Sequence, residues 1–310
     1  MADGMRIVVI GQAAFGEAVL NALVAAGEDV VGVVCAPDKE GKAVDAIKVA
    51  AEGHGIAVHQ FKRMRDREAI DGYRALKADL GVMAFVTDIV PMEILEAPSR
   101  GTIQYHPSLL PKHRGPSSIN WPIIQGDAKT GLSIFWPDEG LDTGPILLQK
   151  ETAIGPDDTL GSVYFKRLFP KGVEAMVESV AMVRAGTAPK LVQDESEATY
   201  EGWCRATECA IDWSRPVAEV HNLIRGADPS PGAGTTCGGG AIQVYDSSKS
   251  EDDSGAEPGV ILDVSDAGVR IAASGGSVLV GRIRGGEVGK VGAAEWAKAA
   301  RVKAGDRVGG

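Results

Sequence analysis

The chain has 310 residues, of which 44% are hydrophobic and 24% charged, and its length suits about two globular domains. This composition excludes a disordered or collagen-like chain, and no apolar run approaches the roughly 20 residues that a membrane span needs. With 32 Lys and Arg against 42 Asp and Glu, the net charge of -10 does not favour polyphosphate partners. The four cysteines are scattered rather than spaced for zinc or a disulfide framework, so we expect a reducing, cytoplasmic setting and no membrane association.

The first part of the chain alternates strand and helix patterns. Buried strands are expected at Arg6–Gly11, 30–35, 56–58, 80–85, Thr102–His106, 132–136 and 146–149. Helices are expected at 17–26 and 43–52, with one long amphipathic helix over 158–185 that breaks near Pro170. Strands that alternate with helices at this interval predict an α/β domain with a Rossmann-like, mostly parallel sheet.

The second part of the chain has a different pattern. Residues 187–200 are polar and contain Pro, which is typical of a linker. A helix over 217–224 is followed by short strands at 241–245, 259–264, 268–272 and 277–283, and residues 247–257 are interpreted as a mobile acidic loop. Short strands with Gly-rich turns predict a small barrel-like domain. The domains are therefore expected at 1–203 and 204–310.

A Gly-rich turn, Gly-Gln-Ala-Ala-Phe-Gly, follows the first strand at 11–16. A dinucleotide-binding turn needs Gly at the middle position, where this chain has Ala13, whose methyl group would crowd a pyrophosphate. The expected second strand also ends without an acidic residue for a ribose. We therefore interpret the turn as structural, and a nicotinamide cofactor is disfavoured.

Candidate catalytic residues lie between 104 and 149. In a strand over Thr102–His106, Gln104 and His106 point to the same face, at the strand end where open parallel sheets bind ligands. Asp142 lies in a Gly-Leu-Asp-Thr-Gly loop that could reach the same edge. An imidazole that moves protons, a carboxylate that orients it and an amide that stabilises an oxyanion together suit acyl chemistry.

Each of these residues also has a structural interpretation when it is taken alone. A single His is often structural, and an Asp in a Gly-flanked loop often serves the turn. His113, between Lys112 and Arg114, is interpreted as part of a solvated basic loop. The remaining histidines show no metal-ligand spacing, so no metal site is expected.

The order of several motifs resembles the formyltransferase family that uses 10-formyltetrahydrofolate. The motifs are IGQAAFG, PDKEGKA, VPMEI, HPSLLPKHRGPSSINW, SIFW, GLDTGPILLQ, ATYEG, IDW and HNLIRG. The similarity covers essentially the whole chain, and it is greatest to the hydrolase domain at the front of 10-formyltetrahydrofolate dehydrogenase. Methionyl-tRNA formyltransferase is similar more loosely. The resemblance implies a formyltransferase fold, followed by a small C-terminal barrel that both groups share.

The resemblance also implies roles for particular residues. His106 matches the catalytic His, and Asp142 matches the essential Asp that orients it beside the folate. Asp88, Ile89 and Val90 match the loop that holds the pterin through backbone contacts. Many members carry Asn two residues before the His, whereas this chain has Gln104, which keeps the N–H donor but is one methylene longer.

The acceptor of the formyl group is left open by the sequence. Water would make the protein a 10-formyltetrahydrofolate hydrolase that needs no metal, and an amine of methionyl-tRNA or an amino sugar would make it a formyltransferase. The stretch 37–48 mixes three lysines with three acidic residues, which favours water or a small acceptor over tRNA. A non-catalytic folate-binding protein is a third interpretation, but it would not require both His106 and Asp142.

Overall fold

The computed structural model describes residues 4–286 and 288–309, which form two compact units. The first unit contains the residues up to Gly115, together with Gly131–Glu151 and Leu168–Tyr200. The second contains Pro116–Thr130, Thr152–Arg167 and the residues from Glu201 onward. Two stretches that precede residue 168 therefore belong to the second unit, and the domain boundary at residue 203 stays a prediction.

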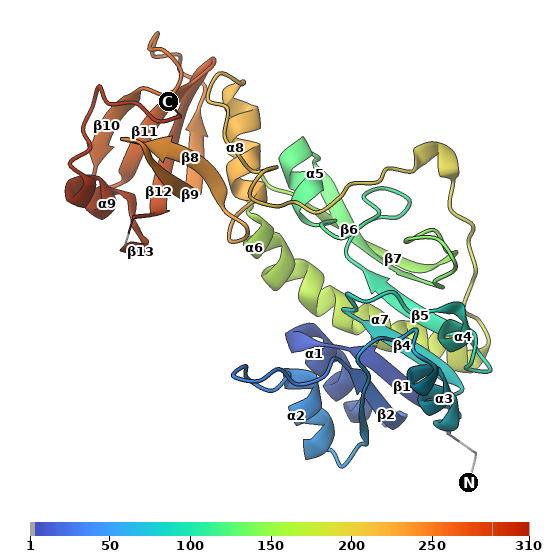
Figure 1. Ribbon diagram of the computed structural model, residues 1–310. Helices are drawn as coiled ribbons and strands as arrows, with labels where there is room; N and C mark the ends of the chain where they lie inside the picture. Colours follow the sequence, from blue (N-terminus) through green and yellow to red (C-terminus); the bar gives the residue numbers. More distant parts are fainter. Residues whose placement is uncertain (1–3, 287, 310) are drawn as a thin grey trace. The chain divides into compact units, whose positions relative to one another are not determined.

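The first unit is built on a seven-stranded sheet (Figure 1). Its strands are β1 (Arg6–Gly11), β2 (Asp29–Cys35), β3 (Val58–Gln60), β4 (Leu80–Ala84), β5 (Thr102–His106), β6 (Lys129–Phe135) and β7 (Ile146–Ala153). The order is β3-β2-β1-β4-β5-β6-β7. The first five strands in this order are parallel to one another, and β6 is antiparallel to β5. This confirms the predicted mostly parallel sheet.

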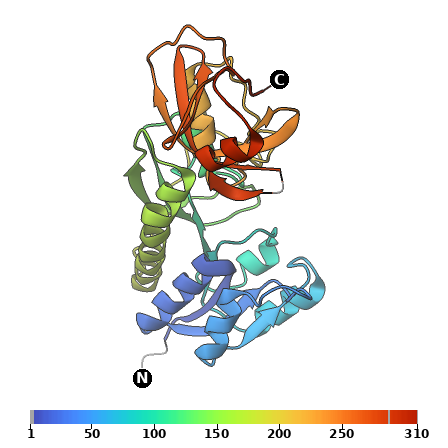
Figure 2. The same cartoon turned by 90° about the vertical axis from the view of Figure 1, so that its left-hand side faces the viewer.

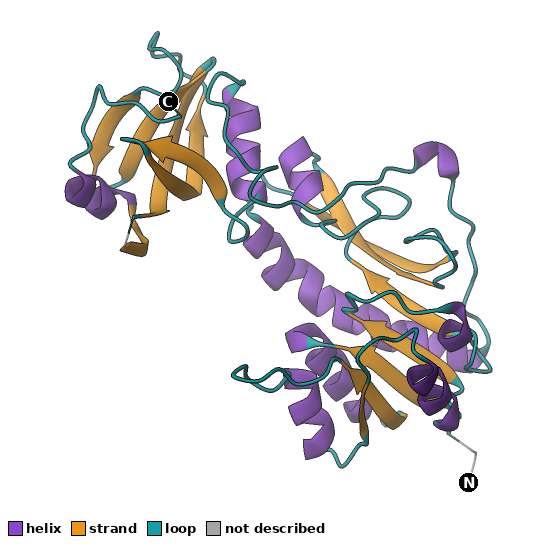
Figure 3. Cartoon of the chain, in the orientation of Figure 1, coloured by secondary structure: helices purple, strands orange, loops and turns teal. Residues whose placement is uncertain are grey.

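Helices cover both faces of this sheet (Figure 3). The helices α1 (Ala13–Ala25), α2 (Ala46–Gly53) and α7 (Phe169–Ala185) share one core cluster, and α3 (Arg67–Ala75) and α4 (Met92–Leu95) share the other. Alternate residues of β1 enter opposite clusters, because Ile7 and Val9 face the first and Val8 and Ile10 face the second. Burial of each such side chain contributes about 1.5–3 kcal/mol, which explains why β1 is apolar from Ile7 to Ile10.

The long helix predicted over 158–185 breaks as expected. It consists of α6 (Leu160–Val163), a π-helical turn η1 (Tyr164–Leu168) and α7, with Pro170 in the first turn of α7. Pro has no backbone N–H and fixes its own φ, so it is tolerated in a first helical turn but not in a helix interior. No helix among residues 4–286 and 288–309 has both the length and the apolar character to cross a membrane.

The Gly-rich turn after β1 serves packing. A Cβ on Gly11 would lie 2.6 Å from the Ala84 carbonyl oxygen, so only glycine allows β1 and β4 to approach here. Ala13 opens α1 at a φ of 55°, and its N–H donates to Asp45 Oδ1 at 2.8 Å. A carboxylate thus caps the helix end where a dinucleotide-binding protein would hold phosphate.

The second unit contains an antiparallel six-stranded sheet, drawn in orange and red in Figure 2. Its strands are β8 (Ala233–Cys237), β9 (Gly240–Ser250), β10 (Ile261–Ser265), β11 (Gly268–Ala273), β12 (Gly276–Gly285) and β13 (Val288–Gly292), in the order β10-β11-β12-β9-β8 with β13 on β12. Its helices include α5 (Asn120–Gln125), α8 (Val217–Gly226) and α9 (Ala293–Ala300). The prediction of a second, β-rich unit is therefore confirmed.

Two loop predictions from composition are wrong. Residues 247–250 are not loop but the end of β9, where they pair with β12, because backbone pairing does not require apolar side chains. The expected linker at 187–200 packs on the first unit instead. Its Leu191 pairs with Ile146, and it includes a short 3₁₀ helix, η2 (Glu195–Glu197). We call residues 191–200 the strap.

Candidate functional site

His106 is the last residue of β5, and both of its ring nitrogens face an acceptor at the carboxyl end of this strand. It is 5% exposed, and its Nε2 lies 2.9 Å from the His113 carbonyl oxygen. Because a carbonyl only accepts, Nε2 carries the proton of this hydrogen bond. The other nitrogen, Nδ1, lies 3.5 Å from Asp142 Oδ2. The sequence-predicted pair is therefore brought together, with an acceptor facing each ring nitrogen.

Asp142 reaches His106 from the loop between β6 and β7. Because β6 is antiparallel to β5, Phe135 lies beside Gln104, and the loop must turn back toward the end of β5. Asp142 makes part of this turn with a φ of 58°, a conformation that Asp adopts more readily than most residues. Its Oδ2 accepts a hydrogen bond from the Gly115 N–H at 2.9 Å, and the residue is 6% exposed.

Buried side chains fix the loop that follows His106. The Ser108 hydroxyl donates to the Lys112 carbonyl at 2.6 Å, and the Ser133 hydroxyl donates to the Ser108 carbonyl at 2.7 Å. Gln149 Nε2 donates to both the Leu110 carbonyl and the Ser133 hydroxyl. With its backbone groups paired in this way, the loop holds one shape.

The strap adds an ion pair that sequence reasoning missed. Arg114 is 7% exposed, and its Nη1 and Nη2 donate to Glu195 at 3.0 and 2.6 Å. This bidentate bond lowers the pKa of the Glu195 carboxyl and raises the pKa of the Arg114 guanidinium. Arg114 also binds Gln193, a strap residue that is itself 5% exposed.

The prediction of a solvated basic loop around His113 is wrong. His113 is 5% exposed, its φ is 56°, and its N–H donates to the Thr199 hydroxyl at 2.8 Å. The strap packs over this stretch of the loop. Its residues are 86 positions away along the chain at the His113–Thr199 contact, so the sequence around His113 does not reveal that this residue is buried.

Gln104 lies on β5 two residues before His106, on the same face of the strand. It is half-buried, and its amide makes no hydrogen bond with any other described residue. An amide in this state can donate to a ligand without breaking a protein contact. Whether it donates to an oxyanion stays a prediction.

The residues predicted to hold a pterin follow β4, the parallel neighbour of β5. Asp88 Oδ2 accepts the Met64 N–H at 3.2 Å, and its Oδ1 accepts the Ile89 N–H at 2.9 Å. Val90 is buried in the α3/α4 core cluster, whereas Ile89 is 85% exposed. Within the described residues, the backbone groups of 86–88 make no backbone hydrogen bonds and are free to bind a ligand.

The site can move protons under electrostatic control. A buried imidazole that faces a carboxylate can gain a proton during a reaction, because the carboxylate stabilises the imidazolium more strongly there than in water. The nearby amide of Gln104 is a suitable partner for a developing oxyanion. Among the described residues, no group of three His, Cys, Asp or Glu side chains forms a metal site.

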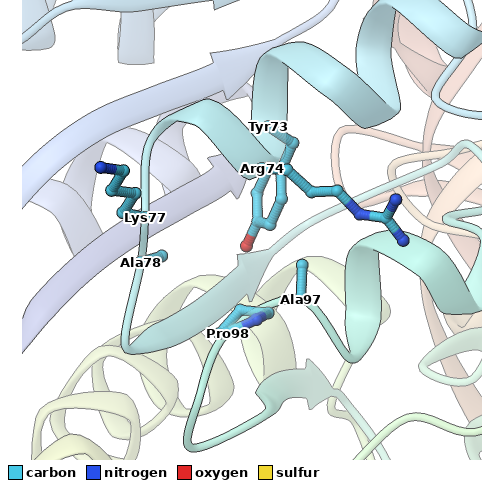
Figure 4. Close-up of a pocket in the computed structure, with 6 residues that line it drawn as sticks. All are labelled: Tyr73, Arg74, Lys77, Ala78, Ala97 and Pro98. Carbon is cyan, nitrogen blue, oxygen red and sulfur yellow. The ribbon is translucent and has the colours of Figure 1, made fainter.

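A cavity of about 330 Å³ lies elsewhere in the first unit (Figure 4). It is lined by Tyr73, Arg74, Lys77, Ala78, Ala97 and Pro98. These residues precede β4 and β5, at the amino ends of the strands, whereas α/β sheets bind ligands at the carboxyl ends. Figure 4 shows that the side chains of Arg74 and Lys77 point in different directions, so no set of polar groups converges here.

Comparisons with known proteins identify the family of the chain. Residues 5–180 match the sequence profile named formyl transferase, and residues 204–301 match that of the formyl transferase C-terminal domain. The cytosolic 10-formyltetrahydrofolate dehydrogenase of Mus musculus is 47% identical over 248 residues, which are 78% of this chain but only 27% of that relative. The chain therefore spans little more than a quarter of that enzyme's length.

Two other proteins are similar along almost the whole chain. Methionyl-tRNA formyltransferase from Trichlorobacter lovleyi is 34% identical over 94% of this chain and 93% of its own length. The solved structure of HypX from Aquifex aeolicus in complex with tetrahydrofolic acid has a TM-score of 0.69 at 17% identity, covers 95% of this chain and 47% of HypX, and supports the fold. The chain belongs to the formyl transferase family.

Proposed function

We propose that the protein hydrolyses 10-formyltetrahydrofolate to tetrahydrofolate and formate in the cytoplasm. The observation that carries the proposal is the buried pair of His106 and Asp142, at 3.5 Å, together with the half-buried side-chain amide of Gln104, which makes no hydrogen bond with the described residues. In this proposal residues 1–203 bind the folate and carry out the reaction, and residues 204–310 form a second domain. The similarity to part of a 10-formyltetrahydrofolate dehydrogenase supports the choice of folate.

The proposed reaction needs one water molecule and two proton transfers. His106 accepts a proton from water as its oxygen bonds to the formyl carbon, and the carbonyl oxygen becomes an oxyanion. Asp142 stabilises the imidazolium, and Gln104 or a backbone N–H donates to the oxyanion. When the bond between the formyl carbon and folate N10 breaks, the imidazolium returns the proton to N10, which leaves tetrahydrofolate and formic acid. The formic acid loses its proton to solvent and is released as formate.

The loop over residues 85–90 suits a pterin in its chemistry. A pterin presents a planar edge of hydrogen-bond donors and acceptors, and backbone N–H and C=O groups complement such an edge. The loop offers unpaired backbone groups at 86–88, and Met64 and Val90 pack in one core cluster that fixes its base. Because β4 and β5 are parallel neighbours, this loop and His106 follow adjacent strands at the same sheet edge.

Water is the proposed acceptor because the loop after β2 offers little positive charge. The three lysines of residues 37–48 are balanced by three acidic residues, and one of them, Lys48, is paired with Asp38. The alternative is formyl transfer to methionyl-tRNA, favoured by the similarity of a methionyl-tRNA formyltransferase across both units. A tRNA enzyme would also need cationic surface for phosphate contacts.

The first prediction tests the acceptor. The purified 310-residue protein is incubated with 10-formyltetrahydrofolate alone, with methionylated initiator tRNA or with an amino sugar, and formate, tetrahydrofolate and formylated amine are measured. We expect formate from the folate alone, at a rate that neither amine raises. Titration of the tRNA at two salt concentrations is the second arm. Formylation of methionine, together with binding that weakens by about 0.9 log unit per log salt for each phosphate contact, would establish the tRNA alternative instead.

The second prediction concerns Gln104. Gln104→Ala should lower kcat less than loss of His106 or Asp142 does, because Gln104 is one methylene longer than the Asn of many family members. Removal of a well-aimed oxyanion donor lowers kcat by about 10²–10³-fold. For Gln104→Ala we expect a smaller loss of kcat, of about tenfold. The control is Gln125→Ala, which removes an exposed amide bonded to Glu201. A loss for Gln104→Ala as large as that for His106→Ala would show that this amide is a principal oxyanion donor.

A further inference from the structure

Gln193 links the strap to the loop that carries Asp142, through every polar atom of its side chain. Its Nε2 donates to the Asp142 carbonyl at 2.9 Å and to the Gly144 carbonyl at 2.7 Å. Its Oε1 accepts from Arg114 Nε at 3.2 Å and from Arg114 Nη2 at 2.8 Å. Since carbonyls only accept and a guanidinium only donates, the amide can take one orientation and no other.

Arg114 lies between the two residues whose backbones hold the proposed catalytic pair. The carbonyl of His113 accepts from His106, and the N–H of Gly115 donates to the Asp142 carboxylate. The side chain of Arg114 acts on the same loop through Gln193. The bidentate bond to Glu195 fixes the guanidinium from its other side. The network therefore closes a ring from the His106 loop through the strap to the Asp142 loop.

We propose that Gln193 is a positioning residue, which sets the Asp142 carboxylate against the His106 imidazole. Asp142 is in a left-handed conformation, so the direction of its side chain follows from the peptide planes on either side. The Gln193 amide binds the carbonyls of Asp142 and Gly144, and both hydrogen bonds are buried. This inference rests on the proposed roles of His106 and Asp142. A displacement of about 1 Å in such a pair can cost about 10²-fold in rate.

The test uses Gln193→Met in the 310-residue protein, because Met keeps the length and volume of Gln without its hydrogen bonds. Val192→Ala is the matched control, since the neighbouring Val192 side chain is 87% exposed. The first readout is the ¹⁵N resonance of His106 Nδ1 in the free protein, assigned with His106→Ala. We expect Gln193→Met to move it in the same direction as Asp142→Asn, and Val192→Ala to leave it in place.

The second readout is the kinetics of formate release. Gln193→Met should lower kcat about 10- to 100-fold and leave KM for the folate within about threefold. In an Asp142→Asn background the same substitution should change kcat by no more than about twofold, because Gln193 acts through the carboxylate. A merely structural role would lower kcat equally in both backgrounds.

An unchanged His106 resonance in Gln193→Met, or equal losses of kcat in both backgrounds, would overturn the inference. If the wild type releases no formate, the proposed function fails, and the resonance still decides whether Gln193 positions Asp142. If Gln193→Met does not fold, Arg114→Lys replaces it under the same criteria. Lys keeps the charge, but it lacks the planar fork that binds Gln193 and Glu195 together.

Discussion

Replacement of His106 by Ala is expected to lower the kcat for formate release by at least about a hundredfold. General acid–base catalysis by a positioned His contributes about 10²–10⁴-fold, and the His106 ring is the group that lies between the His113 carbonyl and Asp142. The measurement is turnover of 10-formyltetrahydrofolate at saturating concentration. Circular dichroism and thermal unfolding show that the variant is folded at the assay temperature.

The matched control for this variant is His54→Ala. His54 follows α2, is exposed, and has its Nε2 2.7 Å from Asn21 Oδ1, far along the chain from the proposed site. Its loss should leave kcat within about twofold, as is usual for surface substitutions. Turnover of His106→Ala near that of the wild type would contradict the assignment of His106 as the proton-transferring group.

The strands of the first unit could be predicted from sequence because a strand that is buried on both faces consists of consecutive apolar residues, which is a local pattern. The strands Arg6–Gly11 and Thr102–His106 were predicted with their observed bounds. Both faces of β1 are covered by helices, so its apolar run is continuous and unambiguous. The spacing of Gln104 and His106 also predicted that these two residues of the candidate site share one face, because side chains alternate between the two faces along a strand.

The strap could not be predicted because its signal is not local. Residues 191–200 are polar, and a polar segment with Pro upstream is typical of a linker. The polar atoms of Gln193 are instead satisfied by Arg114 and by two backbone carbonyls of the Asp142 loop. Composition does not distinguish side chains that bind water from side chains that bind a distant loop.

The prediction of a loop over 247–257 was wrong at 247–250 for a related reason, whereas residues 251–257 do lie outside helices and strands. Its first residues extend β9 because β12 offers a partner for their backbone groups, from Ser247↔Val280 to Ser250↔Ser277. Strand propensity depends strongly on such tertiary context, and Ser and Lys have little propensity of their own. His113 shows the same limit, since its charged neighbours predicted exposure and the strap covers it.

Replacement of Asp142 by Asn is expected to lower kcat by at least about a hundredfold, which corresponds to about 2.7 kcal/mol of transition-state stabilisation. Asn has the same shape and can still accept the Gly115 N–H, so the loop should keep its fold. It lacks the negative charge that stabilises an imidazolium on His106, and charge in a buried site acts at low effective dielectric. The exposed Asp71→Asn, which breaks a surface pair with Arg67, is the control.

The double variant His106→Ala with Asp142→Asn distinguishes cooperation from independent effects. If the carboxylate acts on the reaction through the imidazole, its loss should add little once the ring is gone, as is found for residues that act as a unit. We therefore expect the double variant to be within about threefold of His106→Ala. Fully multiplicative losses would show that Asp142 contributes without His106, for instance by direct contact with the folate. A kcat for Asp142→Asn within threefold of the wild type would contradict any essential role for the carboxylate.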